Sequence, residues 1–204
     1  MKTIEVQGLS KAYNGKTLFK DLSFSADRGD ILYIKGESGS GKTTLLHIIA
    51  KMESPDEGEI AHTGYTVSYA PCSSVLLEAL TIRENLLYAL TRSFMPQSYL
   101  LAEIRDLFIA YGLSLDILYE FPHDLSSGEY KRVLIIRTLL SSATVLLLDE
   151  PTANLDSETA DKVVNNLNEY LKKHTDKLVI IATHDKRFLD SCPPEKIIDI
   201  EKER

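Results

Sequence analysis

Apolar and polar residues alternate along the beginning of the chain, from Thr3 to Tyr13 and again from Leu18 to Ser25. A period of two residues predicts strands with one buried and one solvated face. Between the two segments, Asn14-Gly15-Lys16 is typical of a tight hairpin turn. The sequence therefore predicts an antiparallel pair of strands ahead of the core.

Continuous apolar runs occur at three later positions, 30–35, 145–149 and 178–182. The second and third of these runs are typical of strands that are buried on both faces of a parallel sheet. The segment from Ser157 to Lys173 has helical character and joins the second run to the third. A strand, a helix and a strand in this order predict a parallel βαβ unit.

Helical spacing dominates the middle of the chain. Apolar residues recur at helical intervals in 82–90 and again in 98–111, and no strand pattern occurs between Thr81 and Tyr119. We therefore expect a helical subdomain, approximately 73–129, inserted into a core formed by approximately 1–72 and 130–204. The 204 residues suit one domain of the α/β class with a mixed, mostly parallel sheet.

A glycine-rich segment lies between the predicted strand 30–35 and a predicted helix 42–51. Its nine residues are Gly36, Glu37, Ser38, Gly39, Ser40, Gly41, Lys42, Thr43 and Thr44. They match the P-loop pattern G-x-x-x-x-G-K-[ST] in the required context of a strand before and a helix after. Backbone N–H groups of such a loop, with the positive end of the helix dipole, surround phosphate oxygens. The core is therefore predicted to be that of a P-loop NTPase.

Two residues of this loop have predicted chemical roles. The Lys42 ammonium is expected to contact the β- and γ-phosphates, and the Thr43 hydroxyl is expected to bind Mg²⁺. The alternative is a simple glycine turn between a strand and a helix, which the flanking pattern makes less favourable.

Acidic residues directly follow the apolar run 145–149. Asp149 is expected to hold Mg²⁺ directly or through water, and Glu150 to act as general base on the attacking water. His184 follows the run 178–182, and ligands gather at the carboxyl ends of parallel strands. His184 is therefore expected near the same phosphates. The alternative for Asp149 and Glu150 is that two acids simply end a strand at the surface, and the alternative for His184 is a structural role, which is more common for a lone histidine.

A short polar segment precedes the predicted helix 130–140. Ser126 is a suitable N-cap with Glu129 three residues later, which makes a capping box. The N-terminus of a helix with small residues can also bind an anion. The residues alone do not identify that anion.

Composition excludes several classes of function. The net charge of −7 argues against a nucleic-acid surface. No signal pattern and no bilayer-spanning apolar run are visible. Cys72 and Cys192 have no metal-ligand spacing, which fits a reducing compartment.

The chain resembles an ATP-binding cassette (ABC) ATPase over essentially its whole length. Segment 36–44 resembles the Walker A loop, and 145–150 the Walker B strand with its glutamate. The remaining motifs resemble the family signature (Leu125, Ser126, Ser127, Gly128, Glu129), the D-loop (Ala153, Asn154, Leu155, Asp156), the switch histidine (His184) and the adenine-stacking aromatic (Tyr13).

This resemblance implies ATP and Mg²⁺ as cofactors and a second cassette, identical or not, packed head to tail. The signature of one subunit would then bind the γ-phosphate held by the Walker A loop of the other, with Ser126–Glu129 and Asp156 in contact with nucleotide. It also implies separate transmembrane permease subunits, and hence a cytoplasmic protein held at the inner face of the membrane. The segment 150–156, which contains the D-loop, and the segment Thr183-His184-Asp185 after the third apolar run resemble those of small export-type or lipoprotein-release-type cassettes.

Two positions depart from the family pattern. Cys72 replaces the glutamine that follows the strand and Pro71, and that glutamine normally couples the site to the membrane subunits. Ser127 replaces the first signature glycine. The alternatives are a soluble ABC ATPase without transport and a regulatory nucleotide-binding module with low turnover. A P-loop kinase would lack the signature, the D-loop and the switch histidine.

Overall fold

In the computed structural model, which describes residues 2–62, 64–72, 75–90, 97–190 and 193–201, the chain divides into two units. Unit 1 contains Met1–Pro71, Ala143–Glu150 and Leu171–Arg204. Unit 2 contains Cys72–Ser142 and Pro151–Tyr170. Cys192 lies outside the described residues.

An antiparallel sheet of unit 1 begins with the predicted hairpin. Strand β1 (Ile4–Tyr13) pairs with β2 (Lys16–Ala26), and on its other side β1 pairs with β4 (Glu57–His62). Asn14 and Gly15 close the hairpin with φ angles of 49° and 79°. Positive φ at both central residues is the requirement of a type I′ turn, so the hairpin prediction is confirmed.

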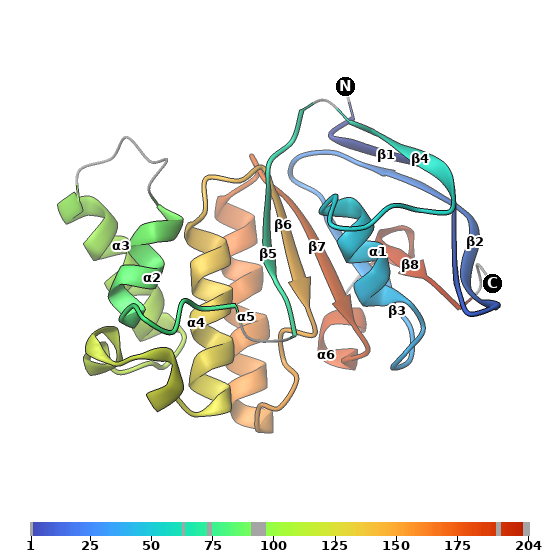
Figure 1. Cartoon of the computed structure of the whole chain (residues 1–204). Helices are drawn as coiled ribbons and strands as arrows, with labels where there is room; N and C mark the ends of the chain where they lie inside the picture. The colour runs from blue at the N-terminus through green and yellow to red at the C-terminus, as the bar shows by residue number, and fades with distance from the viewer. Residues whose placement is uncertain (1, 63, 73–74, 91–96, 191–192, 202–204) are drawn as a thin grey trace. The chain divides into compact units, whose positions relative to one another are not determined.

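The second sheet of unit 1 is entirely parallel, in the order β5-β6-β7-β3-β8. Its central strands β6 and β7 are buried at every position, as their apolar runs predict. The alternating strands and the parallel strands thus form two separate sheets in unit 1 (Figure 1). In that order, the strands are Val67–Ala70, Val145–Asp149, Leu178–Thr183, Ile31–Lys35 and Ile197–Asp199.

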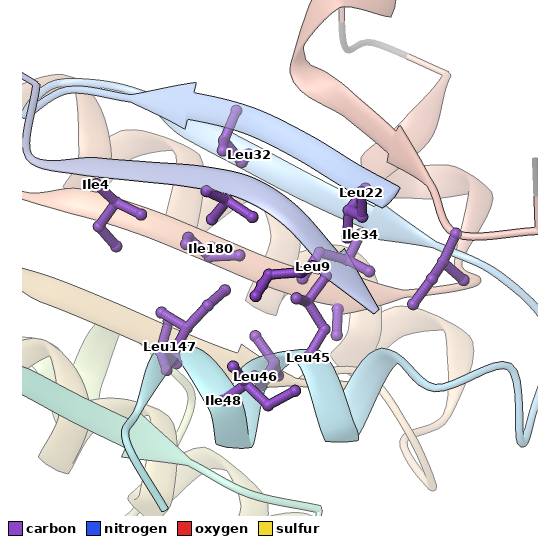
Figure 2. Close-up of a cluster of buried hydrophobic side chains, with 14 of the residues drawn as sticks. Ile4, Leu9, Leu22, Leu32, Ile34, Leu45, Leu46, Ile48, Leu147 and Ile180 are labelled. Carbon is purple, nitrogen blue, oxygen red and sulfur yellow. The ribbon is translucent and has the colours of Figure 1, made fainter. Parts of the chain in front are cut away.

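Helix α1 (Lys42–Ile49) shares one apolar core with both sheets. Leu45 and Leu46 of α1 are fully buried together with residues of β1, β2, β3, β6 and β7. Figure 2 shows these side chains converging between the helix and the strands. The helix ends before the predicted 51, because Lys51 has a φ of 60°, in the left-handed region. The core therefore fixes where α1 begins relative to β3 and β6.

The regular elements described in unit 2 are helical. Helix α4 packs against α2 and α3, and the short 3₁₀ helix η1 contacts α2 and α3. The elements are α2 (Ile82–Ala89), α3 (Gln97–Ala110), η1 (Leu115–Tyr119), η2 (Pro122–Asp124), α4 (Ser127–Leu140) and α5 (Ser157–Lys173), which runs on into unit 1. Unit 2 thus contains the predicted subdomain 73–129 together with Cys72 and the segments 130–142 and 151–170. Unit 1 also contains α6 (Lys186–Leu189) and η3 (Pro194–Lys196).

The core of unit 1 gives a test of the fold. Leu46 is completely buried, so Leu46→Ala should lower the free energy of unfolding by about 2–5 kcal/mol through lost burial and a residual cavity. Met52→Ala is the control, because Met52 is 67% exposed and its truncation should change stability by less than about 0.5 kcal/mol. Urea unfolding followed by circular dichroism measures both. Equal effects of the two substitutions would contradict this core.

Candidate nucleotide-binding site

The loop between β3 and α1 has the backbone conformation that an anion cradle requires. Gly39 and Gly41 have φ angles of 76° and 108°, in the region that favours glycine. A Cβ on Gly41 would also lie 3.0 Å from the Cβ of Leu18. Helix α1 begins at Lys42, so its free N–H groups and positive dipole end follow directly after the loop.

The first glycine of the loop is required by close packing. A Cβ on Gly36 would lie 2.4 Å from Ser40 Oγ and 2.7 Å from Ile200 Cγ2. Both neighbours are buried, with exposures of 1% and 0%. The turn therefore closes only because position 36 has no side chain.

The Lys42 ammonium is almost completely buried, with 6% of the side chain exposed. It donates hydrogen bonds to the carbonyl oxygens of Gly36, at 2.8 Å, and Glu37, at 3.0 Å. It also lies 3.1 Å from Glu150 Oε1. A buried cation is tolerated only when its charge and donors are compensated, and these three oxygens provide that compensation.

Thr43 and Asp149 meet beside this cation. The Thr43 hydroxyl donates to Asp149 Oδ2 at 2.8 Å, and the Tyr69 hydroxyl donates to the same oxygen at 3.4 Å. Asp149 ends β6 and is 1% exposed. Mg²⁺ prefers such hard oxygen donors and usually takes only one or two carboxylates, completing its shell with phosphates and water. The side chains present therefore fit this ion, and the described residues contain no larger cluster of His, Cys, Asp and Glu.

Glu150 occupies an unusual backbone position. Its φ is 46°, which is uncommon for a residue other than glycine, and its N–H donates to the carbonyl of Ala182 on β7 at 2.8 Å. One carboxylate oxygen contacts two basic groups, because Oε1 lies 2.9 Å from His184 Nδ1 and 3.1 Å from Lys42 Nζ. The side chain of Glu150 is 15% exposed, whereas that of His184 is 70% exposed.

These neighbours determine the charge of Glu150. Burial alone would raise the pKa of the carboxyl group, because it disfavours the charged form. The hydrogen bonds and positive charges of His184 and Lys42 outweigh burial and hold the pKa below its ordinary value. Glu150 is therefore an ionised carboxylate at neutral pH, as a general base must be.

Tyr13 lies at the end of β1, and 45% of it is exposed. Its hydroxyl donates to Glu53, and the Lys11 ammonium lies 5.2 Å from the centre of its ring. Lys11 is itself held by Asp56 at 3.0 Å and by the carbonyl of Ser54 at 2.9 Å. The ring is thus held in place, with an exposed surface suitable for stacking.

The predicted capping box of unit 2 is present at the start of α4. Ser126 Oγ accepts from the N–H of Glu129 at 3.3 Å, and the Glu129 carboxylate accepts from the N–H of Ser126 at 3.0 Å. The hydrogen bonds of Ser126 lower the pKa of Glu129. A Cβ on Gly128 would lie 3.3 Å from Leu155 Cδ2, and Ser127 is exposed. The capping role is confirmed, and contact with a nucleotide stays a prediction.

Asp156 has a local structural role in unit 2. Its carboxylate accepts the N–H of Thr159 at 3.0 Å in the first turn of α5, and this hydrogen bonding lowers its pKa. Asn154, two residues earlier, has a φ of 64°. The segment before α5 is therefore a shaped turn that ends in a helix cap.

Cys72 is exposed and lines a pocket of about 320 Å³ in unit 2. The pocket lies beside the start of α4, since Ser127 and Tyr130 line it as well. The remaining lining residues are Leu125, Lys131, Leu134, Ala153 and Asn154. The thiol that replaces the expected glutamine therefore lies next to the residues of the signature.

Sequence reasoning missed three contributors to the site in unit 1. Tyr69 contacts Asp149, Glu53 contacts Tyr13, and Glu201 accepts the N–H of Glu37 at 2.9 Å. All three act across large separations in the chain, for which local patterns carry no signal. The apolar residues 197, 198 and 200 were the one available hint, because they indicate a further strand ahead of Glu201.

A family model described as "ABC transporter" matches residues 19–153, which is more than half of the chain. The chain belongs to the ABC transporter family. The predicted family is thereby confirmed, with the Walker A loop and most of the signature-bearing unit inside the matched segment. Within the described residues, no helix combines the length and apolar character that crossing a membrane requires.

Relatives of this cassette include import and export proteins. The molybdate/tungstate import ATP-binding protein WtpC of Pyrococcus horikoshii is 34% identical, covering 83% of the cassette and 52% of WtpC. The hemin import ATP-binding protein HrtA of Staphylococcus haemolyticus is 30% identical, covering 90% and 88%. The macrolide export ATP-binding/permease protein MacB of Aggregatibacter actinomycetemcomitans is 32% identical, covering 98% and 33%. The cassette thus spans about half the length of WtpC, and the export-type or lipoprotein-release-type subtype stays a prediction.

Solved structures confirm the predicted fold class. The ATP-binding cassette MJ0796, in a dimeric post-hydrolysis state bound to ADP and Pi, has a TM-score of 0.77 and 25% identity, covering 91% of this cassette and 89% of that chain. An ABC transporter ATP-binding protein from Pyrococcus furiosus has a TM-score of 0.80 and 24% identity, covering 98% of each chain. The second likeness concerns the fold alone.

The lowered pKa of Glu150 predicts a pH dependence of stability. A carboxyl group whose pKa is lower in the folded state stabilises the fold above its unfolded pKa, and this contribution is lost as the pH falls through the folded value. The free energy of unfolding should therefore decrease as the pH is lowered below 4.5, the ordinary pKa of glutamate. This decrease should be less steep in Glu150→Gln. Urea titrations at a series of pH values measure both profiles.

The control for this pH profile is Glu158→Gln, since the side chain of Glu158 is 79% exposed on α5, where it forms a surface ion pair with Lys162. Its profile should follow the wild type. Parallel profiles for wild type and Glu150→Gln would contradict the ionic environment of Glu150 described above.

Proposed function

We propose that this cassette binds and hydrolyses ATP as the energy-supplying subunit of an ABC transporter. The observation that carries the proposal is the convergence of three ionisable side chains in unit 1. The carboxylate of Glu150 contacts both Lys42 and His184, and Lys42 lies at the end of the predicted phosphate-binding loop. Few sites other than a phosphate-hydrolysing one need a buried cation, a carboxylate base and a histidine at one point.

Phosphate binding begins with an exchange of partners at Lys42. The carbonyl oxygens of Gly36 and Glu37 now satisfy its ammonium group, and the β- and γ-phosphates would replace part of that compensation. The N–H groups at the start of α1 would bind the same phosphates. Adenine would stack on the exposed ring of Tyr13, which Glu53 and Lys11 hold in place.

Thr43 and Asp149 would hold Mg²⁺ through their oxygens. When bound, the ion neutralises phosphate charge and orients the β- and γ-phosphates. Tyr69 shares the Asp149 oxygen with Thr43 and would keep this carboxylate oriented.

Hydrolysis requires a base for the attacking water. The Glu150 carboxylate would accept a proton from this water while the water oxygen bonds to the γ-phosphorus and ADP leaves. Lys42 now lowers the pKa of Glu150, so a shift of the ammonium toward the phosphates would make the carboxylate more basic. His184 would keep Glu150 oriented through its hydrogen bond of 2.9 Å.

A second cassette would complete each site. In this arrangement Ser126–Glu129 of one subunit contacts the γ-phosphate held by the loop 36–44 of the other, and Asp156 lies at the shared interface. The dimeric state of the related MJ0796 cassette supports this arrangement. The names of the relatives support membrane permeases as further partners, at the cytoplasmic face of a membrane.

Two substitutions test the proposed reaction. Glu150→Gln removes the base but keeps the shape, so it should bind Mg-ATP and lose about 10²- to 10⁴-fold in turnover. With ATP it should accumulate as a dimer, which light scattering detects. Lys42→Ala should lose nucleotide binding, which a fluorescent ATP analogue measures.

Glu158→Gln is again the matched control and should keep the wild-type turnover. Normal hydrolysis by Glu150→Gln would place the general base elsewhere, and an unchanged ATP affinity of Lys42→Ala would remove the phosphate site from this loop.

A further inference from the structure

The segment that follows β8 lies along the beginning of the phosphate loop. Ile200 donates its N–H to the carbonyl of Lys35 at 3.0 Å, and its side chain is fully buried against the position of Gly36. The next residue, Glu201, donates its own N–H to Asp199 Oδ1 at 3.3 Å. The backbone of this segment is thus fixed at the point where the loop leaves β3.

Glu201 makes a direct contact with the loop. Its Oε1 accepts the N–H of Glu37 at 2.9 Å, across a separation of 164 residues. The carbonyl of the same Glu37 accepts from Lys42 Nζ at 3.0 Å and from the N–H of Ser40 at 3.2 Å. Both the N–H and the carbonyl of Glu37 are therefore hydrogen-bonded, and Glu201 is the partner of the N–H.

We propose that Glu201 is a positioning residue of the nucleotide site. Its carboxylate holds the N–H of the Gly36–Glu37 peptide group. The carbonyl of that same peptide group is the Gly36 carbonyl, which accepts from Lys42 Nζ at 2.8 Å, so Glu201 orients a carbonyl that contacts Lys42. The loop is then pre-organised before nucleotide arrives, which reduces the cost of ordering it on binding. This inference rests on the proposed function, because it assigns Glu201 to the ATP site. Glu201 lies outside the matched family segment 19–153, so the family model does not assign it this role.

The contact combines two opposing effects. As a hydrogen-bond acceptor Glu201 stabilises the loop, whereas its negative charge repels a triphosphate bound nearby. Gln at this position keeps a side-chain carbonyl oxygen and removes the charge, and Ala removes both. Comparing the two variants separates positioning from charge.

Positioning predicts a specific pattern of binding. One exposed hydrogen bond contributes about 0.5–1.5 kcal/mol, so Glu201→Ala should weaken Mg-ATP affinity by about 2- to 10-fold. Glu201→Gln should keep an affinity at least equal to that of the wild type. The KM for ATP should rise in Glu201→Ala with kcat unchanged, because Glu201 contacts no reacting atom. Titration of the full chain with a fluorescent ATP analogue and steady-state kinetics measure these quantities.

Glu195→Ala is the matched control, since Glu195 is an exposed acid in the same segment of the chain. It should bind ATP like the wild type. Amide hydrogen exchange at Glu37 in nucleotide-free protein adds a readout that does not depend on ATP, and exchange should be faster in Glu201→Ala than in Glu201→Gln.

The outcomes are distinguishable. Wild-type ATP affinity together with wild-type hydrogen exchange in Glu201→Ala would overturn the positioning role. Equally tightened ATP binding in Glu201→Ala and Glu201→Gln would also overturn it, because the charge of Glu201 would then account for the whole effect. A wild-type chain that does not bind Mg-ATP would instead overturn the proposed function.

Discussion

A buried positive charge at Lys42 is the constraint on which the site depends. The ammonium group is stable in a largely water-free position only because two loop carbonyls and the Glu150 carboxylate surround it. These oxygens come from separate parts of the chain, the loop after β3 and the residue after β6. The strand order β6-β7-β3 and the apolar core around α1 bring those parts together. The compensation of one cation thus connects the fold of unit 1 to its chemistry.

In the proposed reaction, the same constraint links ATP binding to ATP hydrolysis. Glu150 is shared by Lys42 and His184, and both lower its pKa. Phosphates that draw the lysine away would change the basicity of the carboxylate at the moment when a substrate is present. Thr43 and Asp149 form a second preassembled pair beside it. The geometry of unit 1 therefore holds these side chains in one place, through contacts that a nucleotide would replace in the proposed reaction.

Local patterns explain what the sequence could predict. The hairpin at Asn14-Gly15, the apolar strands β6 and β7 and the capping box of Ser126 and Glu129 each depend on residues close together in the chain. The loop motif and the acids after β6 likewise predicted residues that the structure brings together around Lys42. The separation of the strands into two sheets, strand β8 and the contacts of Tyr69 and Glu201 depend instead on distant segments. Hydrophobic periodicity describes only local sequence and cannot predict which distant segments pair, so these contacts are known only from the structure.

The central claim is that the loop 36–44 and its catalytic groups form half of an ATP site, which another cassette completes through its Ser126–Glu129 segment. The most direct measurement is the rate of ATP hydrolysis per cassette as a function of protein concentration, at saturating Mg-ATP. A site shared between two cassettes predicts a specific rate that rises with concentration and then levels off as dimers form. A constant specific rate in dilute solutions where light scattering finds only monomers would contradict the claim.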